Sequence, residues 1–373
     1  MSATVRTALA VAMKAQVSVL IWGGAGMGKS SAVREMAAAA GLPCETVIAS
    51  IREPSDFAGL PVVSESGQSV RFAPPSWAQR LLEAGRGVLF LDEISTAPPA
   101  VQAALLRVVL ERTVGDLHLP TGVTVVAAAN PPEQAADGWE ISPPLANRFC
   151  HLDWDLGARE WADGVLGGFD VPVVADVDPD VLKQRRAAVR AAVSGFVVSR
   201  PHLLHAHPGN ESSAGRAWPS PRSWEMATHL VAYCDAAATP DAVAALLLAG
   251  CVGPGVAAEF LAWRDDLRLP DAEDVLRDPE SFELPERGDR AFAALAALTA
   301  AVLSNNTAER WEAAWRAIAA GTADGRTDIA VSAIRSLIAH RPAGAVPAAQ
   351  TLSKMAPVLR EAGLFEALTA TNA

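Results

Sequence analysis

The stretch Gly23-Gly24-Ala25-Gly26-Met27-Gly28-Lys29-Ser30 determines the fold of this chain of 373 residues. It follows the apolar run 17–22 and precedes a helix-forming stretch at 31–40, which is the strand–loop–helix order that a phosphate-binding loop needs. Glycines let backbone N–H groups turn towards phosphate oxygens, and the next helix contributes its positive N-terminal end. Lys29 is expected to reach the β- and γ-phosphates, and the Ser30 hydroxyl to ligate Mg²⁺. The alternative, a glycine-rich turn without a ligand, fits less well because the motif is complete.

The composition indicates a large buried core and an acidic surface. Hydrophobic residues make up 50% of the chain, charged residues 20%, and the formal net charge is −11. The length suggests about two to three domains. An acidic chain is unsuited to bulk electrostatic binding of nucleic acid, although a local basic patch in an oligomer is not excluded.

Cysteine usage and the N-terminus predict a cytoplasmic protein. The four cysteines, Cys44, Cys150, Cys234 and Cys251, lie far apart without the paired spacing of a disulfide framework or a zinc site. We expect buried or free thiols in a reducing compartment. The N-terminus lacks a secretory signal pattern, and no uninterrupted apolar stretch reaches the ~18 residues of a membrane span.

The sequence pattern changes near Asp155. Before it, short and almost continuous apolar runs alternate with helix-like segments, as in a parallel sheet whose strands are buried on both faces. After it, strands disappear and Ala-rich helices follow. The expected strands are 17–22, 45–49, 87–91, 123–129 and a short one near 149–152. The expected later helices are 179–198, 221–236, 240–250, 254–264, 289–303, 307–320, 327–339 and 347–369, with a linker at 265–288.

A second motif places two carboxylates at the end of a buried strand. In Val88-Leu89-Phe90-Leu91-Asp92-Glu93, four apolar residues precede the acidic pair. Ligands of open α/β sheets bind at the carboxyl ends of the strands. We therefore expect Asp92 to hold Mg²⁺, and Glu93 to polarise a water molecule for attack on the γ-phosphate. Such a pair alone is often a solvated strand end, but this one follows a phosphate loop.

A third strand also ends in one polar residue. The run 123–129 is apolar and leads into Asn130, which is expected to share the attacking water with Glu93. On its own, an Asn before prolines is more often a turn former. Its place after the first two motifs favours the catalytic interpretation.

Together these motifs resemble the AAA+ ATPases, and within that superfamily the MoxR-type group. The resemblance covers about residues 5–265 and includes Leu145-Ala146-Asn147-Arg148-Phe149 and Ser220-Pro221-Arg222-Ser223. Its other marks are Leu91-Asp92-Glu93-Ile94, Ala129-Asn130-Pro131, Arg52-Glu53-Pro54-Ser55-Asp56-Phe57-Ala58-Gly59 and Pro99-Ala100-Val101-Gln102-Ala103-Ala104-Leu105-Leu106. It implies an α/β fold, an AAA+ P-loop αβα sandwich with a parallel sheet, followed by an all-α lid and a C-terminal helical extension. The implied domains are 1–156, 157–266 and 267–373.

The resemblance assigns roles to three polar residues. Asn130 corresponds to sensor 1, and Arg148 to the arginine finger given to the nucleotide of a neighbouring subunit. Arg222 corresponds to sensor 2, on a lid helix that folds over the nucleotide of its own subunit. A guanidinium suits both roles because it presents several fixed donors to the charge of a γ-phosphate in transfer. The alternatives are a surface salt bridge for Arg148 and the same, or a helix start, for Arg222.

The resemblance also implies a ring and a partner. Segment 52–75 corresponds to the helix-2 insert, and Thr113 to Pro120 to the hairpin before sensor 1, both of which face a central pore in such rings. MoxR-type proteins typically form hexamers and often act with a partner that carries a von Willebrand factor A domain. One departure is the absence, after the second strand, of the Asn that often restrains the catalytic Glu. Ser50 or Arg52 can replace it, or this control is absent.

The sequence thus predicts an ATP hydrolase that uses Mg²⁺ and forms a homo-oligomer to remodel or activate a protein partner. The catalytic residues are Glu93, Asn130, Arg148 and Arg222, and the metal ligands are Ser30 and Asp92. The nucleotide-binding residues are Gly23, Gly24, Ala25, Gly26, Met27, Gly28, Lys29, Ser30 and Ser31. The alternatives are a nucleotide-gated scaffold with little turnover and a DNA-processing motor. The motor ranks lower because the hairpin at 113–120 contains no Lys or Arg.

Two lesser patterns have structural explanations. His202, His205 and His207 lie in a loop rich in Pro and Gly, without the cysteines or carboxylates that would complete a metal site, so we expect solvated side chains. Trp311 and Trp315 are four positions apart on an expected helix, which favours core packing or a partner-facing stripe.

Overall fold

The computed structural model describes residues 3–64, 67–131, 139–267, 269–323 and 325–369, and the chain forms two compact units. The first comprises residues 1–177 and 203–258, and the second residues 178–202 and 259–373. One of the three boundaries between them falls inside helix α12 (Pro254–Asp266). This division reflects packing alone, so the three functional domains expected from the sequence stay a prediction.

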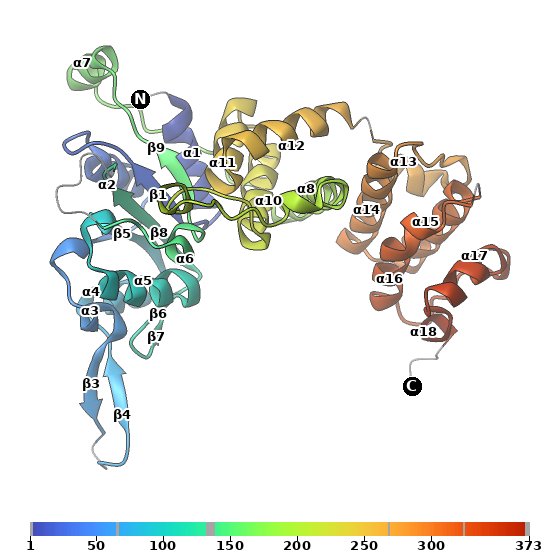
Figure 1. The fold of residues 1–373 in the computed structure, drawn as a ribbon, viewed down its shortest axis with the longest axis horizontal. Coiled ribbons are helices and arrows are strands. Elements are labelled where there is room, and N and C mark those ends of the chain that lie inside the picture. Colours follow the sequence, from blue (N-terminus) through green and yellow to red (C-terminus); the bar gives the residue numbers. More distant parts are fainter. Residues whose placement is uncertain (1–2, 65–66, 132–138, 268, 324, 370–373) are drawn as a thin grey trace. The chain divides into compact units, whose positions relative to one another are not determined.

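A five-stranded parallel sheet forms the centre of the first unit (Figure 1). Its order is β2-β5-β8-β1-β9, so the strand before the phosphate loop lies between the strand that leads into Asn130 and β9. The strands are β1 (Val19–Trp22), β2 (Cys44–Ile48), β5 (Arg86–Asp92), β8 (Gly122–Ala129) and β9 (Cys150–Asp153). All five expected strands are confirmed. β5 and β8 are buried along almost their whole length, which explains their continuous apolar sequence.

Helices enclose this sheet. The stripe expected on α5 (Pro99–Glu111) is confirmed, because Val101, Leu105, Val108 and Val109 are buried in the core of the unit. α11 (Asp241–Val252) packs against β9 at Gly250, where a Cβ atom would lie 2.3 Å from the carbonyl oxygen of His151. The other helices of this unit are α1 (Ala3–Lys14), α2 (Lys29–Ala39), α3 (Ser55–Ala58), α4 (Ser76–Ala84), α6 (Pro143–Ala146), α7 (Ala158–Gly167), α9 (Glu211–Ala214) and α10 (Pro221–Ala236). No described helix is long and apolar enough to cross a membrane.

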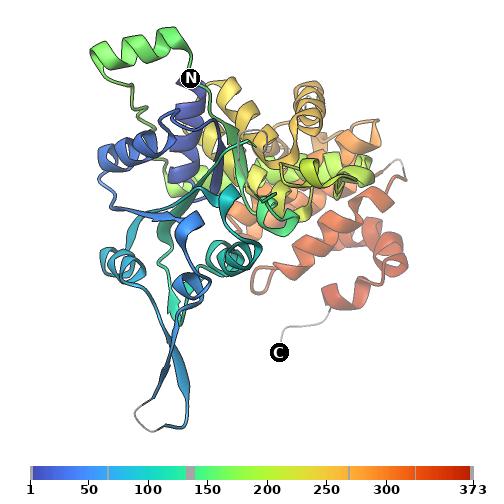
Figure 2. The ribbon, with the colours of Figure 1, turned by 60° about the vertical axis from the view of Figure 1, so that its left-hand side comes forward.

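Two hairpins lie outside the main sheet. β3 (Leu60–Val63) pairs antiparallel with β4 (Val70–Ala73), and this hairpin projects from the first unit in both ribbon views (Figures 1 and 2). A shorter hairpin joins β6 (Thr113–Val114) to β7 (Leu117–His118). The two hairpins are bonded together, because Phe72 donates its N–H to Asp116 Oδ2 at 2.7 Å and accepts from the Asp116 N–H at 3.0 Å.

The second unit is entirely helical in the part of the chain that is described. Its helices are α8 (Pro179–Ser199), the end of α12, α13 (Ala272–Arg277), α14 (Gly288–Ser304), α15 (Ala308–Gly321), α16 (Val331–Ala339), α17 (Ala349–Glu361) and α18 (Phe365–Thr369). Asp178 caps α8 through two backbone N–H groups. Trp311 and Trp315 are both fully buried, which confirms core packing for this pair.

Two expectations for this unit are wrong. The segment 265–288 is no linker, since it contains α13 and buries Phe282 and Leu284 in the core of the unit. The single helix expected at 347–369 is two helices, which part near Gly363, where φ is +67°. Glycine adopts this conformation without steric cost, so it ends α17.

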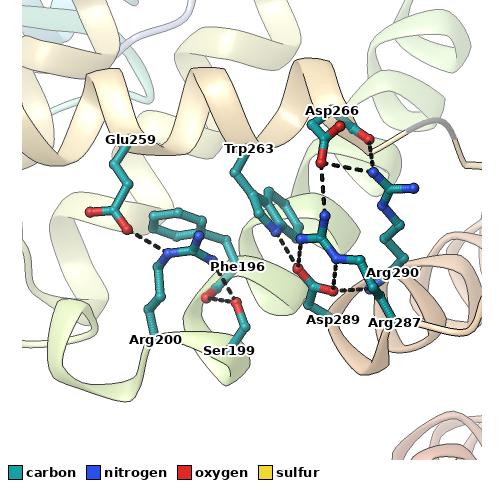
Figure 3. A network of polar contacts seen from close by, with 9 residues as sticks. All are labelled: Phe196, Ser199, Arg200, Glu259, Trp263, Asp266, Arg287, Asp289 and Arg290. Atoms are coloured by element: carbon teal, nitrogen blue, oxygen red, sulfur yellow. Dashed lines mark hydrogen bonds and ion pairs between the residues drawn. The ribbon is translucent and has the colours of Figure 1, made fainter.

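An ion-pair network joins the end of α12 to the start of α14 in the second unit (Figure 3). Asp266 Oδ2 accepts from Arg287 at 2.8 Å and from Arg290 at 2.7 Å. Asp289 accepts from the indole N–H of Trp263 at 2.7 Å and from Arg287 at 2.8 Å. Burial alone would raise the pKa of Asp289, but the hydrogen bonds from Arg287 and Trp263 outweigh it and lower that pKa to about 2.

Candidate active site

The phosphate loop lies between β1 and α2 in the conformation that its glycines permit. Gly26 and Gly28 both have a φ of +76°, a region that residues with a Cβ atom rarely occupy. Lys29 begins α2, and its side chain is buried. Lys29 Nζ donates to the Gly23 and Gly24 carbonyl oxygens at 2.6 and 2.9 Å. The side chain of Lys29 therefore folds back onto the backbone of the loop. Ser31, the remaining residue of the expected nucleotide site, is exposed on the first turn of α2.

The same lysine joins the loop to the strand that ends in Asn130. Lys29 Nζ donates to Asn130 Oδ1 at 3.0 Å, and the Asn130 N–H donates to Ser95 Oγ at 3.1 Å. Burial lowers the pKa of Lys29, and the carboxylates of Asp92 and Glu93 oppose that shift. The positive group therefore lies within the field of the acidic pair, as the order of the motifs predicted.

Ser30 and Asp92 come together at the end of β5. The Ser30 hydroxyl donates to Asp92 Oδ2 at 2.6 Å. A hydroxyl and a carboxylate oxygen are the kinds of ligand that Mg²⁺ takes from a protein, with phosphate oxygens and water completing its shell. These two residues therefore fit the magnesium site that the sequence predicted.

Glu93 is held by Ser50, in the short turn that follows strand β2. It lies in the left-handed region with a φ of +56°, which is costly for a residue with a side chain. The Ser50 hydroxyl donates to Glu93 Oε2 at 2.5 Å. Of the two substitutes that the sequence suggested for the missing Asn, Ser50 is the one that contacts Glu93.

One tryptophan contacts the phosphate loop and another directly precedes it, and no motif assigned a role to either. The Trp154 indole N–H donates to the Met27 carbonyl at 3.1 Å, and a Cβ atom on Gly23 would lie 2.5 Å from the Trp154 carbonyl oxygen. Trp22, which directly precedes the loop, donates its indole N–H to His151 Nδ1 at 2.9 Å. These contacts join residues far apart in the sequence, so spacing alone could not reveal them.

His151 is locked as a neutral imidazole inside the first unit. With Nδ1 accepting from Trp22, Nε2 carries the proton and donates to the Ala146 carbonyl at 2.9 Å. Burial lowers the pKa of His151 to about 4, although the hydrogen bond to Ala146 opposes this shift. Ala146 ends helix α6, so the imidazole connects the strand before the phosphate loop to the helix that precedes Arg148.

Arg148 lies in the electrostatic field of Arg222. Arg148 Nη1 donates to the Pro144 carbonyl, and burial lowers the pKa of Arg148. The positive charge of Arg222 lowers that pKa further. Within the described residues, neither arginine is among the hydrogen-bond or ion-pair partners of Lys29, Asp92 or Glu93.

All three loop histidines are exposed, which confirms the expectation of solvated side chains. His205 and His207 contact the ring of Trp218, with centroids 5.5 and 4.9 Å away. Across the described part of the chain, no group of three or more His, Cys, Asp or Glu side chains is arranged to hold a metal ion.

Comparisons with known proteins agree with this geometry. Residues 18–149 match the family model of the AAA domain, dynein-related subfamily. No curated protein matches the sequence. Among solved structures, a candidate ATPase from Cytophaga hutchinsonii is 16% identical with a TM-score of 0.41, covering 68% of this chain and 87% of its own. That likeness is too distant to carry an argument about function. The motif geometry and the family match show that residues 18–149 contain an AAA domain, the nucleotide-binding domain of AAA+ ATPases.

Proposed function

We propose that the protein hydrolyses MgATP by in-line attack of water on the γ-phosphate. The observation that carries this proposal is the meeting of Lys29, Ser30, Asp92, Glu93 and Asn130 at the carboxyl edge of one parallel sheet. A bound nucleotide would take over the donors that Lys29 now gives to the loop carbonyls. Mg²⁺, held by Ser30 and Asp92, would neutralise charge on the phosphates.

Glu93 and Asn130 are the residues that we assign to the attacking water. Glu93 is exposed at the strand end and accepts its proton, while the amide of Asn130 orients it. The hydrogen bond from Ser50 fixes the Glu93 carboxylate and occupies one of its oxygens. We infer that this hydrogen bond restrains Glu93, and that nucleotide or a neighbouring subunit releases it.

We propose that Arg148 and Arg222 act on the nucleotide of a neighbouring subunit in a homo-oligomeric ring. Sequence resemblance assigned Arg222 to its own nucleotide, but the residue before Arg148 is hydrogen-bonded to the N-cap of the helix that carries Arg222, which favours joint delivery. Two neighbouring guanidinium groups repel each other, and a γ-phosphate between them would remove that cost. In related phosphate chemistry a trans arginine is worth about 10³–10⁵ in turnover, so an isolated subunit should be slow.

The output that we propose is the remodelling or activation of a protein partner, as in the MoxR-type group. The β3–β4 hairpin supports this, since Leu60, Val63, Val70 and Phe72 are 62%, 64%, 54% and 41% exposed. A hairpin with exposed apolar side chains suits an extended polypeptide better than a phosphate backbone. A hexamer and a partner with a von Willebrand factor A domain remain the specific expectations of that resemblance.

The hydrolysis proposal is tested with Glu93→Gln, which should keep ATP binding and lose turnover. The matched control is Glu111→Gln, an exposed carboxylate on α5 that pairs only with Arg107 in the described structure. Phosphate release is measured at concentrations where the oligomer forms. Unchanged turnover in Glu93→Gln would exclude this mechanism. Slow release by the wild-type oligomer, with tight ATP binding, would favour the nucleotide-gated scaffold.

The remodelling proposal is tested with Val63→Ser against Leu82→Ser, an exposed apolar residue on α4. Unfolded polypeptide and duplex DNA are the two probes. Stimulation of turnover by the polypeptide should fall in Val63→Ser and persist in Leu82→Ser. Stimulation of turnover by DNA instead would favour the DNA-processing motor.

A further inference from the structure

We propose that Asn147 is a positioning residue that locks Arg148 and Arg222 into one body, delivered together to the neighbouring active site. This inference rests on the proposed function of the two arginines. Its starting point is the side chain of Asn147, which is 4% exposed and directly precedes Arg148 at the end of α6.

Both ends of the Asn147 amide bind the segment that leads into α10. Its Nδ2 donates to the Trp218 carbonyl at 3.1 Å, and its Oδ1 accepts from the Ser220 hydroxyl at 2.6 Å. A buried amide with both functions satisfied is costly to displace, since breaking either bond leaves a polar group unpaired. The end of α6 is therefore fastened to one point on the chain before α10.

Ser220 is also the N-cap of α10, and Arg222 is on the first turn of that helix. The Ser223 N–H donates to Ser220 Oγ at 3.1 Å, and the Ser220 N–H donates to Ser223 Oγ at 2.8 Å. Ser223 Oγ donates in turn to the Trp218 carbonyl at 2.9 Å. Ser220 Oγ and the Trp218 carbonyl thus bond both to the N-terminal cap of the helix that carries Arg222 and to the side chain of Asn147, which precedes Arg148.

This shared cap holds the two segments that carry the like charges against each other. Arg222 opposes the positive charge of Arg148, and the two side chains would separate if their backbones were free. Asn147 and the cap hold the backbones together at buried positions, where Ser220 is 5% and Ser223 0% exposed. The arginine pair is thus organised before a phosphate arrives, which lowers the entropic cost of placing it.

Mixed oligomers test this inference separately from the proposed function. The donor subunit carries Glu93→Gln, which supplies both arginines but does not hydrolyse ATP. The recipient carries Arg148→Ala and Arg222→Ala, which leave its own Lys29 and Glu93 intact. Mixing should restore turnover above the sum of the two separate proteins. If mixing restores nothing, joint action in trans is overturned, and this inference fails with it.

Asn147→Ala is then added to the donor or to the recipient. In the donor, restored turnover should fall by about tenfold or more, because a misplacement of ~1 Å in a reacting group costs up to ~10². In the recipient, turnover should hardly change, since that subunit has no arginines to position. If Asn147→Ala changes the restored turnover equally in the donor and in the recipient, the positioning role is overturned, while catalysis in trans is left intact.

Two further variants guard against loss of folding. Ser220→Ala removes the other half of the contact and should give the same donor-specific defect. Thr228→Val removes a buried hydroxyl on α10 that bonds within the helix, to the Trp224 carbonyl at 2.8 Å. It should leave both mixtures unchanged. A defect in Thr228→Val as large as that in Asn147→Ala would assign the effect to general destabilisation and overturn the inference.

Discussion

The hydroxyl of Ser50, which follows strand β2, donates a hydrogen bond of 2.5 Å to Oε2 of Glu93, which follows strand β5. The two strands are neighbours in the sheet, so their carboxyl ends bring the two side chains together. Glu93 must be free to accept a proton from water if it is the catalytic base. A donor on the same carboxylate stabilises its ionised form and therefore works against that step.

Replacing Ser50 by Ala should raise basal ATP turnover. A hydrogen bond of this kind at a partly exposed site is worth about 1 kcal/mol, so we expect an increase of about fivefold in kcat. Ser50→Thr keeps the hydroxyl and serves as the control. Steady-state phosphate release checks the prediction, and a decrease in Ser50→Ala would mean that Ser50 supports Glu93 rather than restrains it.

Replacing Gly115 by Ala should detach the β6–β7 hairpin from the β3–β4 hairpin. Gly115 has a φ of +60°, and a Cβ atom there would lie 2.5 Å from the carbonyl oxygen of Phe72. We expect a loss of about 1–3 kcal/mol in the free energy of unfolding and faster hydrogen exchange at the Phe72 amide.

The matched control for this prediction is Gly67→Ala. Gly67 has a φ of +69°, but a Cβ atom added there would meet no described atom within 4 Å beyond its chain neighbours, so only backbone strain is added. Exchange at Phe72 should stay slow in this variant. Equal exchange in the two variants would show that the contact at Gly115 does not hold the hairpins together.

The central sheet could be predicted from the sequence mainly because β1, β5 and β8 are buried apolar runs that lead into the phosphate loop, the acidic pair and Asn130. The complete burial of β1 and the near-continuous burial of β5 and β8 left little ambiguity about those strands. The strands β3 and β4 carried no such signal, since almost all of their residues are exposed. β3 is a four-residue apolar run that contains Pro61, and proline argues against a strand.

The residues of the active site that belong to sequence motifs could be predicted. Those that support it through hydrogen bonds to residues distant in the sequence could not. Lys29, Asp92 and Asn130 follow strands in a recognisable order, and they meet at one edge. Trp154 and Asn147 have no motif role of their own, because their partners Met27 and Ser220 are brought close only by folding. Polar contacts between residues distant in sequence cannot be read from spacing.

His151 should make the stability of the first unit depend on pH. Its pKa falls from 6.5 in an exposed imidazole to about 4 in the folded chain, mainly because it is buried. A depressed pKa means that the unfolded chain binds the extra proton first. The stabilisation is therefore complete above pH 6.5 and is lost as the pH falls towards 4, by about 3 kcal/mol in total.

This prediction is checked by urea unfolding at several pH values between about 4 and 7.5, with His151→Gln as the comparison. The variant lacks the titrating group, so its free energy of unfolding should change less over this range than that of the wild-type chain. Trp22 keeps an acceptor in the amide oxygen of Gln. The same pH dependence in both proteins would assign the effect to other groups.

Asp289 should stabilise the second unit far more than an exposed acidic residue does. Its side chain is 12% exposed and accepts from Trp263 and Arg287, so Asp289→Asn weakens both bonds inside the network of Figure 3. We expect a loss of about 1–3 kcal/mol. Asp274→Asn is the control, because Asp274 and Arg277 are 69% and 75% exposed, and such pairs contribute under about 1 kcal/mol.

The pH dependence gives an independent check on Asp289. Its folded pKa of about 2 lies below the ordinary 3.8, so its stabilisation is present above pH 3.8 and is lost as the pH falls towards 2. Thermal unfolding of wild-type chain and Asp289→Asn should therefore differ at neutral pH and converge in acid. High salt should reduce the small Asp274 effect but leave most of the Asp289 effect, since buried pairs are screened less. Equal salt sensitivity of the two variants would contradict the view that Asp289 acts from a buried position.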